Sequence, residues 1–326
     1  MAKSDGVRLD AKDMRILAEM DFGARKPLSE IARKAGLSKQ AVDYRIKAMT
    51  RSGVIEGFYP VINAPKLGYI YCRMFVQFKS LEQGQEKELR KYIFGTKSLF
   101  WALALGGTYD YLLVYWVKSL EEFRRLSMEF RERFGGITRG KLENVVTDVI
   151  HLSHRLFRPG EVKRFDLQET SDVVDVDETD RKIMKALAVN ARASLMEMSQ
   201  KTGIPPKVVS YRIKRLERNS VIAGYRPIIN YSKLGLTYFK VFFNLNARDV
   251  KEFARFERYL MNSGKTIYIV HGVGMPGDMD VELLAASNSD FFDFIREAKN
   301  RFPKTIADYS YLIYTETIKV NYVSFY

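Results

Sequence analysis

Two stretches of this 326-residue chain place cationic and polar side chains at helical spacing opposite an apolar stripe. The stripe of the first stretch is Val42, Ile46 and Met49, and an equivalent stripe follows 167 residues later. A helix that enters the DNA major groove needs such an apolar back and a polar, cationic front. The candidate contact residues on the two fronts are Ser38, Lys39, Gln40, Tyr44, Arg45, Lys47, Lys207, Ser210, Tyr211, Arg212 and Lys214.

Each basic stretch is the third of three helical patterns. In the first copy the patterns cover 10–20, 28–35 and 38–52, with apolar residues three and four positions apart. Gly36 is placed to end the second helix in a left-handed conformation, and Ser38 is placed to cap the third. Two short helices, a tight turn and a longer basic helix are typical of a helix-turn-helix unit.

The chain is an internal duplication. Asp10 and Asp177 open two segments that align without a gap through Gly68 and Gly235. The run Tyr-Arg-Ile-Lys at 44–47 recurs unchanged at 211–214, and Lys-Leu-Gly at 66–68 recurs at 233–235. Agreement over such a length indicates that one unit has been copied within the chain.

The segments after the two helical units share a rhythm of strands and helices. Alternating and β-branched runs predict strands, and three- and four-residue apolar spacing predicts helices. The order βαββαβ in both segments predicts a ferredoxin-like sheet with two helices on one face. We therefore expect an α+β protein with helix-turn-helix units at 1–68 and 176–235, ferredoxin-like units at 69–157 and 236–326, and a linker at 158–175.

Composition limits the function classes. The formal net charge is +14, and the helical units carry most of it: 13 basic against 8 acidic residues in 1–68, and 12 against 5 in 176–235. This concentration favours phosphate-contacting modules over a diffuse solvating charge. One cysteine, Cys72, and three histidines argue against a disulfide framework or a Cys/His zinc site. We expect a cytoplasmic protein with no membrane span, metal or cofactor.

The residues that carry the duplication also resemble a known family. The matching positions include Leu28-Ser-Glu-Ile-Ala32, Gly36-Leu-Ser38, Gly53-Val-Ile55, Leu67-Gly68 and Gly107-Thr-Tyr-Asp110. The chain resembles the Lrp/AsnC (feast/famine) transcription regulators of archaeal type, in tandem. The resemblance covers nearly the whole chain, because each half matches the family pattern once.

This resemblance implies winged helix-turn-helix binding to double-stranded DNA, joined to an α+β effector and assembly domain called the RAM domain. It implies an imperfect palindromic target, a homo-oligomer formed through RAM sheets, and an amino acid as small-molecule effector. The single chain should fold as a pseudo-dimer of its two RAM sheets. The implied effector residues are Gly106, Gly107, Thr108, Tyr109, Asp110, Gly272, Gly274 and Asp280.

The second copy departs from the family pattern. Its recognition helix begins at Pro205-Pro206 where the family favours a serine cap, and Ser220 replaces the family glycine. The second effector turn is longer and lacks the tyrosine. The two halves are therefore expected to do different jobs.

Three alternatives stay open at the level of the sequence. Siroheme decarboxylases use the same fused architecture, but their histidine-bearing strand corresponds here to the apolar stretch 99–105, and only His271 lies near such a place. A basic protein that coats DNA with little sequence preference is a second alternative. Helical units with merely solvated basic faces are the third. Arg45 and Arg212 could each reach guanine, phosphate or solvent.

Overall fold

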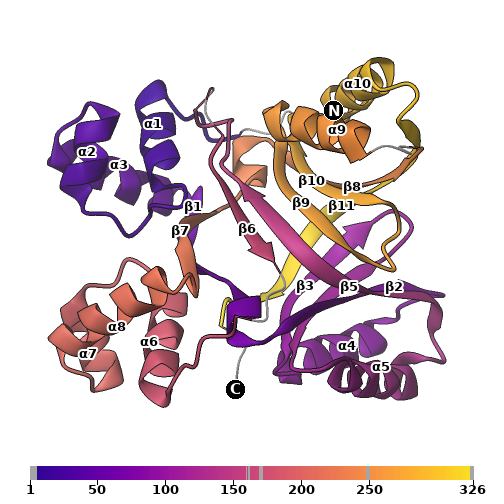
Figure 1. Ribbon diagram of the computed structural model, residues 1–326, viewed down its shortest axis with the longest axis horizontal. Coiled ribbons are helices and arrows are strands. Elements are labelled where there is room, and N and C mark those ends of the chain that lie inside the picture. Colours follow the sequence, from indigo (N-terminus) through magenta and orange to yellow (C-terminus); the bar gives the residue numbers. More distant parts are fainter. Residues whose placement is uncertain (1–5, 159, 161, 169–171, 247–249, 324–326) are drawn as a thin grey trace.

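The computed structural model describes residues 6–158, 160, 162–168, 172–246 and 250–323. Two helix-turn-helix units lie at one side of the molecule and a large closed sheet lies at the other (Figure 1). The first unit comprises α1 (Ala11–Met20), α2 (Leu28–Ala35) and α3 (Lys39–Arg51), and the second comprises α6 (Glu178–Val189), α7 (Leu195–Thr202) and α8 (Pro206–Arg218). The helix-turn-helix expectation is confirmed.

Each helical unit leads through a strand and a short 3₁₀ turn into a ferredoxin-like unit. The strands are β1 (Ile55–Ile62) and β7 (Ile222–Ile229), followed by turns η1 (Ala64–Leu67) and η2 (Ser232–Leu234). β1 and β7 pair with each other antiparallel, so the two halves are joined next to their helical units. One apolar core runs through both helical units and this ribbon.

The two ferredoxin-like units follow the expected order. The first comprises β2 (Ile70–Phe78), α4 (Gln83–Gly95), β3 (Leu99–Gly106), β4 (Tyr111–Val117), α5 (Leu120–Phe134) and β5 (Thr138–Leu152). The second comprises β8 (Thr237–Leu245), α9 (Val250–Asn262), β9 (Thr266–Val273), β10 (Met279–Ala285), α10 (Asn288–Arg301) and β11 (Ile306–Val320). The four helices cover the outside of the sheets, where they bury two separate apolar clusters.

The two sheets close into one eight-stranded barrel. Within each sheet the strands follow the ferredoxin-like order, β5-β2-β4-β3 and β11-β8-β10-β9. β3 then pairs with β11, and β9 pairs with β5. The last strand of each unit makes this possible, because its first half pairs within its own sheet and its second half pairs with the other sheet. The expected pseudo-dimer is formed by this closure.

The linker is more ordered than its composition suggests. β6 (Arg164–Gln168) lies within the expected linker and pairs antiparallel with the end of β5. These five residues form a strand because the open edge of β5 offers them backbone partners. Linker residues 159, 161 and 169–171 lie outside the described part of the chain.

None of the helices in the described part of the chain combines the length and the apolar character that a bilayer crossing requires.

Candidate nucleic-acid interface

The recognition helices α3 and α8 are positioned by the apolar stripes that the sequence shows. Val42, Ile46 and Met49 are buried against the first unit, and the equivalent residues of α8 are buried against the second. Ser38 caps α3, and its hydroxyl accepts from the backbone N–H of Ala41 at 3.1 Å. Pro205 takes the corresponding place before α8 and makes no side-chain cap. The opposite faces of both helices therefore remain free for contacts outside the chain.

Most of the predicted contact residues lie on these outward faces. Tyr44 is 66% exposed and Tyr211 is 59% exposed, which is unusual for large aromatic side chains. Lys47 is exposed and pairs with Asp43 one turn earlier at 2.6 Å. Ser210 is half-buried, and the remaining exposed residues are Lys39, Gln40, Lys207 and Lys214.

The two predicted arginines turn inward instead. Nη1 of Arg45 lies 2.8 Å from a carboxylate oxygen of both Asp10 and Asp13, which form the capping box of α1. Arg212 repeats the contact at Asp177, 2.7 Å away, and Asp180. Each arginine thus ties the recognition helix to the first helix of its unit. The structure gives these residues an internal partner, which the charge pattern did not foresee.

The contacts of Arg45 and Arg212 also affect the pKa of the carboxylates that they bind. The pKa of Asp10 lies below its ordinary value because the backbone N–H of Asp13 donates to it and Arg45 adds a further hydrogen bond. The pKa of Asp177 is lowered in the same way by the N–H of Asp180 and by Arg212. Both carboxylates are therefore held in the charged form that the arginines bind.

The two helical units are docked to each other by a reciprocal contact. Nη1 of Arg25 donates to the carbonyl oxygens of Ala191 and Ala193 at 2.6 and 2.8 Å. Arg192, its counterpart 167 residues later, donates to the carbonyl oxygen of Ala24. The relative position of the two recognition helices is thus fixed within one chain. The sequence showed these arginines as repeat positions and gave no sign of their role.

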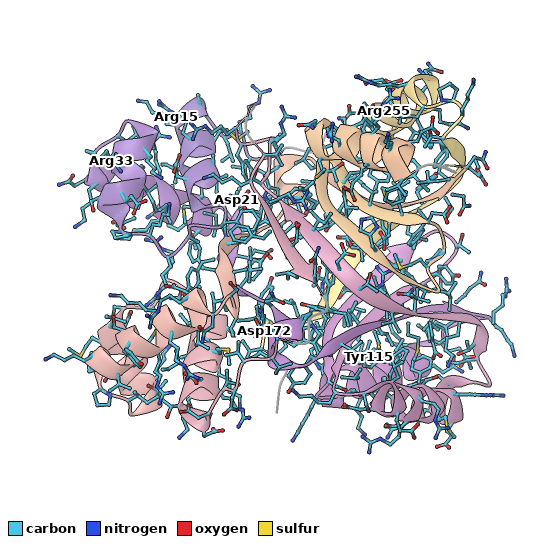
Figure 2. The ribbon with its side chains drawn as sticks, viewed as in Figure 1. Arg15, Asp21, Arg33, Tyr115, Asp172 and Arg255 are labelled. Carbon is cyan, nitrogen blue, oxygen red and sulfur yellow. The ribbon has the colours of Figure 1, made fainter. Side chains whose placement is uncertain are left out.

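A buried polar cluster joins the first helical unit to the sheet. Asp21 lies between the unit and the barrel, whereas Arg15 and Arg33 project outward from α1 and α2 (Figure 2). Oδ1 of Asp21 lies 2.7 Å from Nε of Arg226, and Oδ2 accepts from the backbone N–H of His154 at 2.7 Å. Burial by itself would raise the pKa of Asp21, but Arg226 and His154 together hold it well below its usual range. These residues anchor the unit rather than contact a partner.

The predicted effector residues of the first RAM unit form a tight turn between β3 and β4. Asp110 accepts from the backbone N–H of Phe78 at 2.7 Å, and Tyr109 packs against Phe75 at a ring distance of 5.3 Å. Gly107 has φ +133°, and a Cβ there would lie 2.9 Å from the side chain of Leu312 on β11. The turn, which also holds Gly106 and the exposed Thr108, therefore leans on the opposite half of the chain.

The residues of the second effector set differ in burial, because Gly274 is exposed and Asp280 is fully buried. Gly272 and Gly274 lie over β5, where added Cβ atoms would meet backbone atoms of residues 143–146. Asp280 pairs with Val270 on β9 and contacts Arg73, which also contacts Met275 next to Gly274. It belongs to β10, is fully buried and points into the barrel, so its grouping with an exposed turn is corrected.

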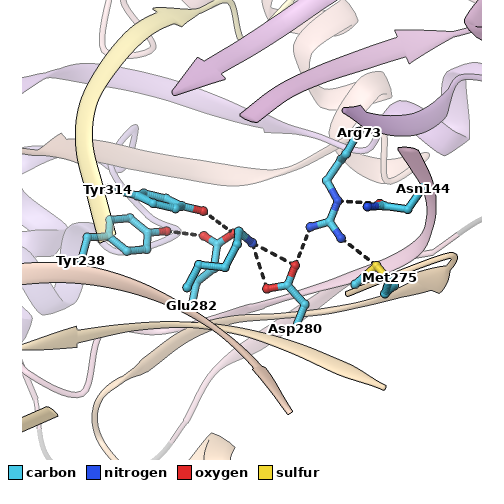
Figure 3. A network of polar contacts seen from close by, with 8 residues as sticks. Arg73, Asn144, Tyr238, Met275, Asp280, Glu282 and Tyr314 are labelled. Carbon is cyan, nitrogen blue, oxygen red and sulfur yellow. Dashed lines mark hydrogen bonds and ion pairs between the residues drawn. The ribbon is translucent and has the colours of Figure 1, made fainter. Parts of the chain in front are cut away.

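Inside the barrel Asp280 belongs to a network of opposite charges (Figure 3). Its carboxylate lies 2.9 Å from Nζ of Lys240 and 2.6 Å from Nη1 of Arg73. Lys240 also bonds Glu282 at 2.6 Å, and Tyr314 donates to Glu282 at 2.9 Å. Two cations thus meet two carboxylates where each is at most 4% exposed. The charges balance within the barrel, as burial requires.

This network is shared unequally between the halves. Arg73 and Lys240 are 167 residues apart and occupy equivalent places on β2 and β8. The residues opposite Lys240 on β10 are acidic, whereas the equivalent stretch of β4 is apolar throughout. Arg73 of the first half is therefore neutralised by Asp280 of the second. The sequence could have revealed the cations as a repeat pair, but not that one carboxylate serves both.

The described residues contain no group of three His, Cys, Asp or Glu side chains placed to hold a metal ion. His271, the residue nearest to the enzyme pattern, lies on β9 and contacts Oε1 of Glu257 at 2.9 Å. His154 belongs to the cluster around Asp21, and His151 packs edge-on against Tyr268.

Comparison with known proteins places both helical units in one class. Residues 9–50 match the AsnC-type helix-turn-helix domain, and residues 176–223 match a winged helix-turn-helix DNA-binding model. The proline dehydrogenase transcriptional activator of Rhodobacter capsulatus is 33% identical over 124 residues, which are 37% of this chain and 79% of that protein. The regulator LrpA of Pyrococcus horikoshii is 46% identical over 61 residues, which are 19% of this chain and 43% of that protein.

A solved structure matches nearly the whole chain. The siroheme decarboxylase NirDL aligns with a TM-score of 0.60 and 12% identity, covering 95% of this chain and 93% of that one. At this identity the likeness concerns the fold, namely two helix-turn-helix units fused alternately with two ferredoxin-like units.

Replacement of Arg45 by alanine tests the tie between α3 and α1. Because the pKa of Asp10 is lowered in the folded chain, the stability it contributes is present above its ordinary value of 3.8 and is lost as the pH falls through the lower folded value. Arg45→Ala should lower the melting temperature by a few degrees at pH 7, and the difference from wild type should shrink below pH 4. Thermal unfolding across this range measures it. The exposed Arg33→Ala is the control, and an equal effect of both variants would contradict the assignment.

Replacement of Asp280 by alanine tests the barrel network. The variant leaves Arg73 and Lys240 buried with one carboxylate between them, and breaking such a buried pair costs about 3–5 kcal/mol of unfolding free energy. Asp280→Asn, which keeps the shape and some hydrogen bonds, should cost less. Urea unfolding measures the free energy of unfolding of both variants, and Glu132→Gln at an exposed position is the control. A loss no larger than that of the control would show that the network adds nothing.

Proposed function

The chain belongs to the Lrp/AsnC family of transcriptional regulators, and from this premise we propose that it binds double-stranded DNA with two unlike recognition helices, α3 and α8. The observation that carries the proposal is the exposure of both helix fronts on units that the reciprocal Arg25 and Arg192 contacts hold in fixed relation. A single chain then presents two different recognition helices, and its target is an imperfect palindrome.

The residues proposed to contact DNA divide by chemistry. Lys39, Lys207 and Lys214 are exposed cations suited to phosphate, and Gln40 is suited to a base edge. Tyr44 and Tyr211 present flat polar side chains at equivalent places. Arg45 and Arg212 serve DNA binding by fixing the angle of each recognition helix, because their guanidinium groups already bind carboxylates.

Selection from random duplex DNA at two salt concentrations tests the function. A sequence-specific regulator should enrich an imperfect palindrome with half-sites one helical turn, or a multiple of it, apart. Binding with a steep salt dependence and no enriched motif would instead indicate a DNA-coating protein. Absence of binding at both concentrations would overturn the proposal.

Single lysine variants test the contacts. Lys39→Ala and Lys207→Ala should each weaken binding to all sequences alike and reduce the slope of log affinity against log salt by about 1, since each removes one phosphate contact. Lys87→Ala removes an equal charge from the exposed face of α4 and is the matched control. Fluorescence anisotropy over a salt series measures the slopes. Slopes that match the control would remove these lysines from the interface.

We further propose that an amino acid binds beside the turn of Gly106, Gly107, Thr108, Tyr109 and Asp110. What supports this is the approach of Gly107 to β11, because a ligand there would contact both halves of the barrel. One or more of the twenty amino acids should raise the melting temperature, and Thr108→Val, which keeps the shape of an exposed side chain, should reduce the shift. If no amino acid raises it, the turn has only a structural role.

Assembly into larger oligomers would need other surfaces than the RAM sheet edges. β3, β11, β9 and β5 already pair with one another within the chain. We propose that further copies associate through the outer helices or the turns. We also propose that the protein is not an enzyme. The support is that the similar regulators named above are transcription factors. A tetrapyrrole absorption band in the purified protein would argue against this proposal.

A further inference from the structure

A cleft of about 670 Å³ lies between the two helical units. Its walls are the back half of α3, the start of β1 and the end of α6. Ile46 and Phe58 give it an apolar lining, and Val189 stands at its rim with 74% of its surface exposed. Such a volume is within the range of sites that hold small organic molecules.

The duplication supplies an internal comparison, because every lining residue has a counterpart 167 positions away. At the equivalent place Phe22 stands where the cleft has Val189, and Tyr225 stands where it has Phe58. The hydroxyl of Tyr225 donates to Glu217 at 2.7 Å, and Tyr225 is only 6% exposed. The second place is thus filled by the side chain of Tyr225, while the ring of Phe22 packs against Phe165 and the guanidinium of Arg226.

The two places also differ in the number of backbone hydrogen bonds between the helical units. At the filled place the N–H of Ala24 donates to Tyr225 and the N–H of Tyr225 donates to Phe22, at 2.9 and 3.1 Å. At the cleft the N–H of Ala191 donates to Phe58 at 3.0 Å, and the described residues show no second bond of this kind. The duplication produces two equivalent interfaces between the helical units, and the cleft lies at the one that side chains do not fill.

The charge at the cleft favours an anion. Lys47, Arg51 and Arg192 line it, whereas Asp43 is its one acidic side chain and already pairs with Lys47. Arg51 packs near the ring of Tyr44, and within the described residues it has no carboxylate at ion-pair distance. A guanidinium beside an apolar wall is suited to a ligand with a carboxylate at one end and an apolar body.

We propose that this cleft binds a small organic anion, an aromatic or branched aliphatic carboxylate, with its apolar body against Ile46, Phe58 and Val189 and its carboxylate on Arg51. Binding itself does not depend on the proposed function. Because the cleft is lined by α3, an occupant would also contact the helix proposed to read DNA, and that consequence rests on the proposed function.

Fluorescence titration with 8-anilinonaphthalene-1-sulfonate, an aromatic anion, tests the site in the full chain without DNA. One saturable site per chain is expected. Val189→Phe places a bulkier side chain at the rim of the cleft and should weaken binding at least tenfold without loss of folding, since position 189 is exposed. Arg51→Gln should weaken binding about fivefold, and the matched Arg218→Gln at the counterpart position should leave it unchanged.

Competition tests the charge of the ligand. Indole-3-acetate should displace the probe, and tryptamine, which has a similar ring and the opposite charge, should not. Wild-type affinity in Val189→Phe, equal effects of Arg51→Gln and Arg218→Gln, or displacement by tryptamine would each overturn the proposal. DNA binding measured on the same wild-type preparation reports separately on the proposed function, so failure of one is distinguishable from failure of the other.

Discussion

Pairing of two sheet edges across the duplicated halves is the constraint on which the rest of the structure depends. A four-stranded ferredoxin-like sheet leaves edge strands with unsatisfied N–H and C=O groups. Here β5 and β11, each 15 residues long, extend past their own sheets and pair with β9 and β3. The closed barrel that results fixes the position of the two ferredoxin-like units and thereby of the helical units that precede them.

Closure also explains the buried charges. A lone cation inside a barrel would be costly, because its buried charge would have no partner. Asp280 supplies it from the other half, at 2.6 Å. The two halves therefore differ in a complementary way, because the second half supplies the acidic side chains that the equivalent strand of the first half lacks.

The same divergence appears at the helical units. Asp21 anchors the first unit through Arg226, whereas the equivalent residues of the other copy are Ala188 and Tyr59. Tyr225, bonded to Glu217, fills one interface between the helical units, and the equivalent interface at Val189 holds a cleft. A dimer of identical chains would have two equal interfaces. Fusion into one chain allows them to differ, and so allows two unlike recognition helices.

The helices and strands and their order along the chain follow from local sequence patterns. Period-3.6 stripes set α3 and α8, the exact repeat revealed the duplication, and the βαββαβ rhythm set both sheets, because these features depend on neighbours along the chain. Strand β6 escaped prediction because its partner, the edge of β5, is created only by folding. The exposed lysines and tyrosines of the recognition helices were also visible in the pattern.

Which charged groups bind partners within the chain depends on how the chain folds. The sequence placed Arg45 and Arg212 on the predicted cationic fronts and showed Arg25 and Arg192 only as a repeat pair, but each of the four has acceptors from a distant segment. It likewise showed Asp280 beside a glycine-rich turn, whereas the strand register turns it into the barrel. The physical reason is common to both: whether a charged group faces solvent or a buried partner depends on contacts between residues far apart in the chain, and composition and periodicity do not report them.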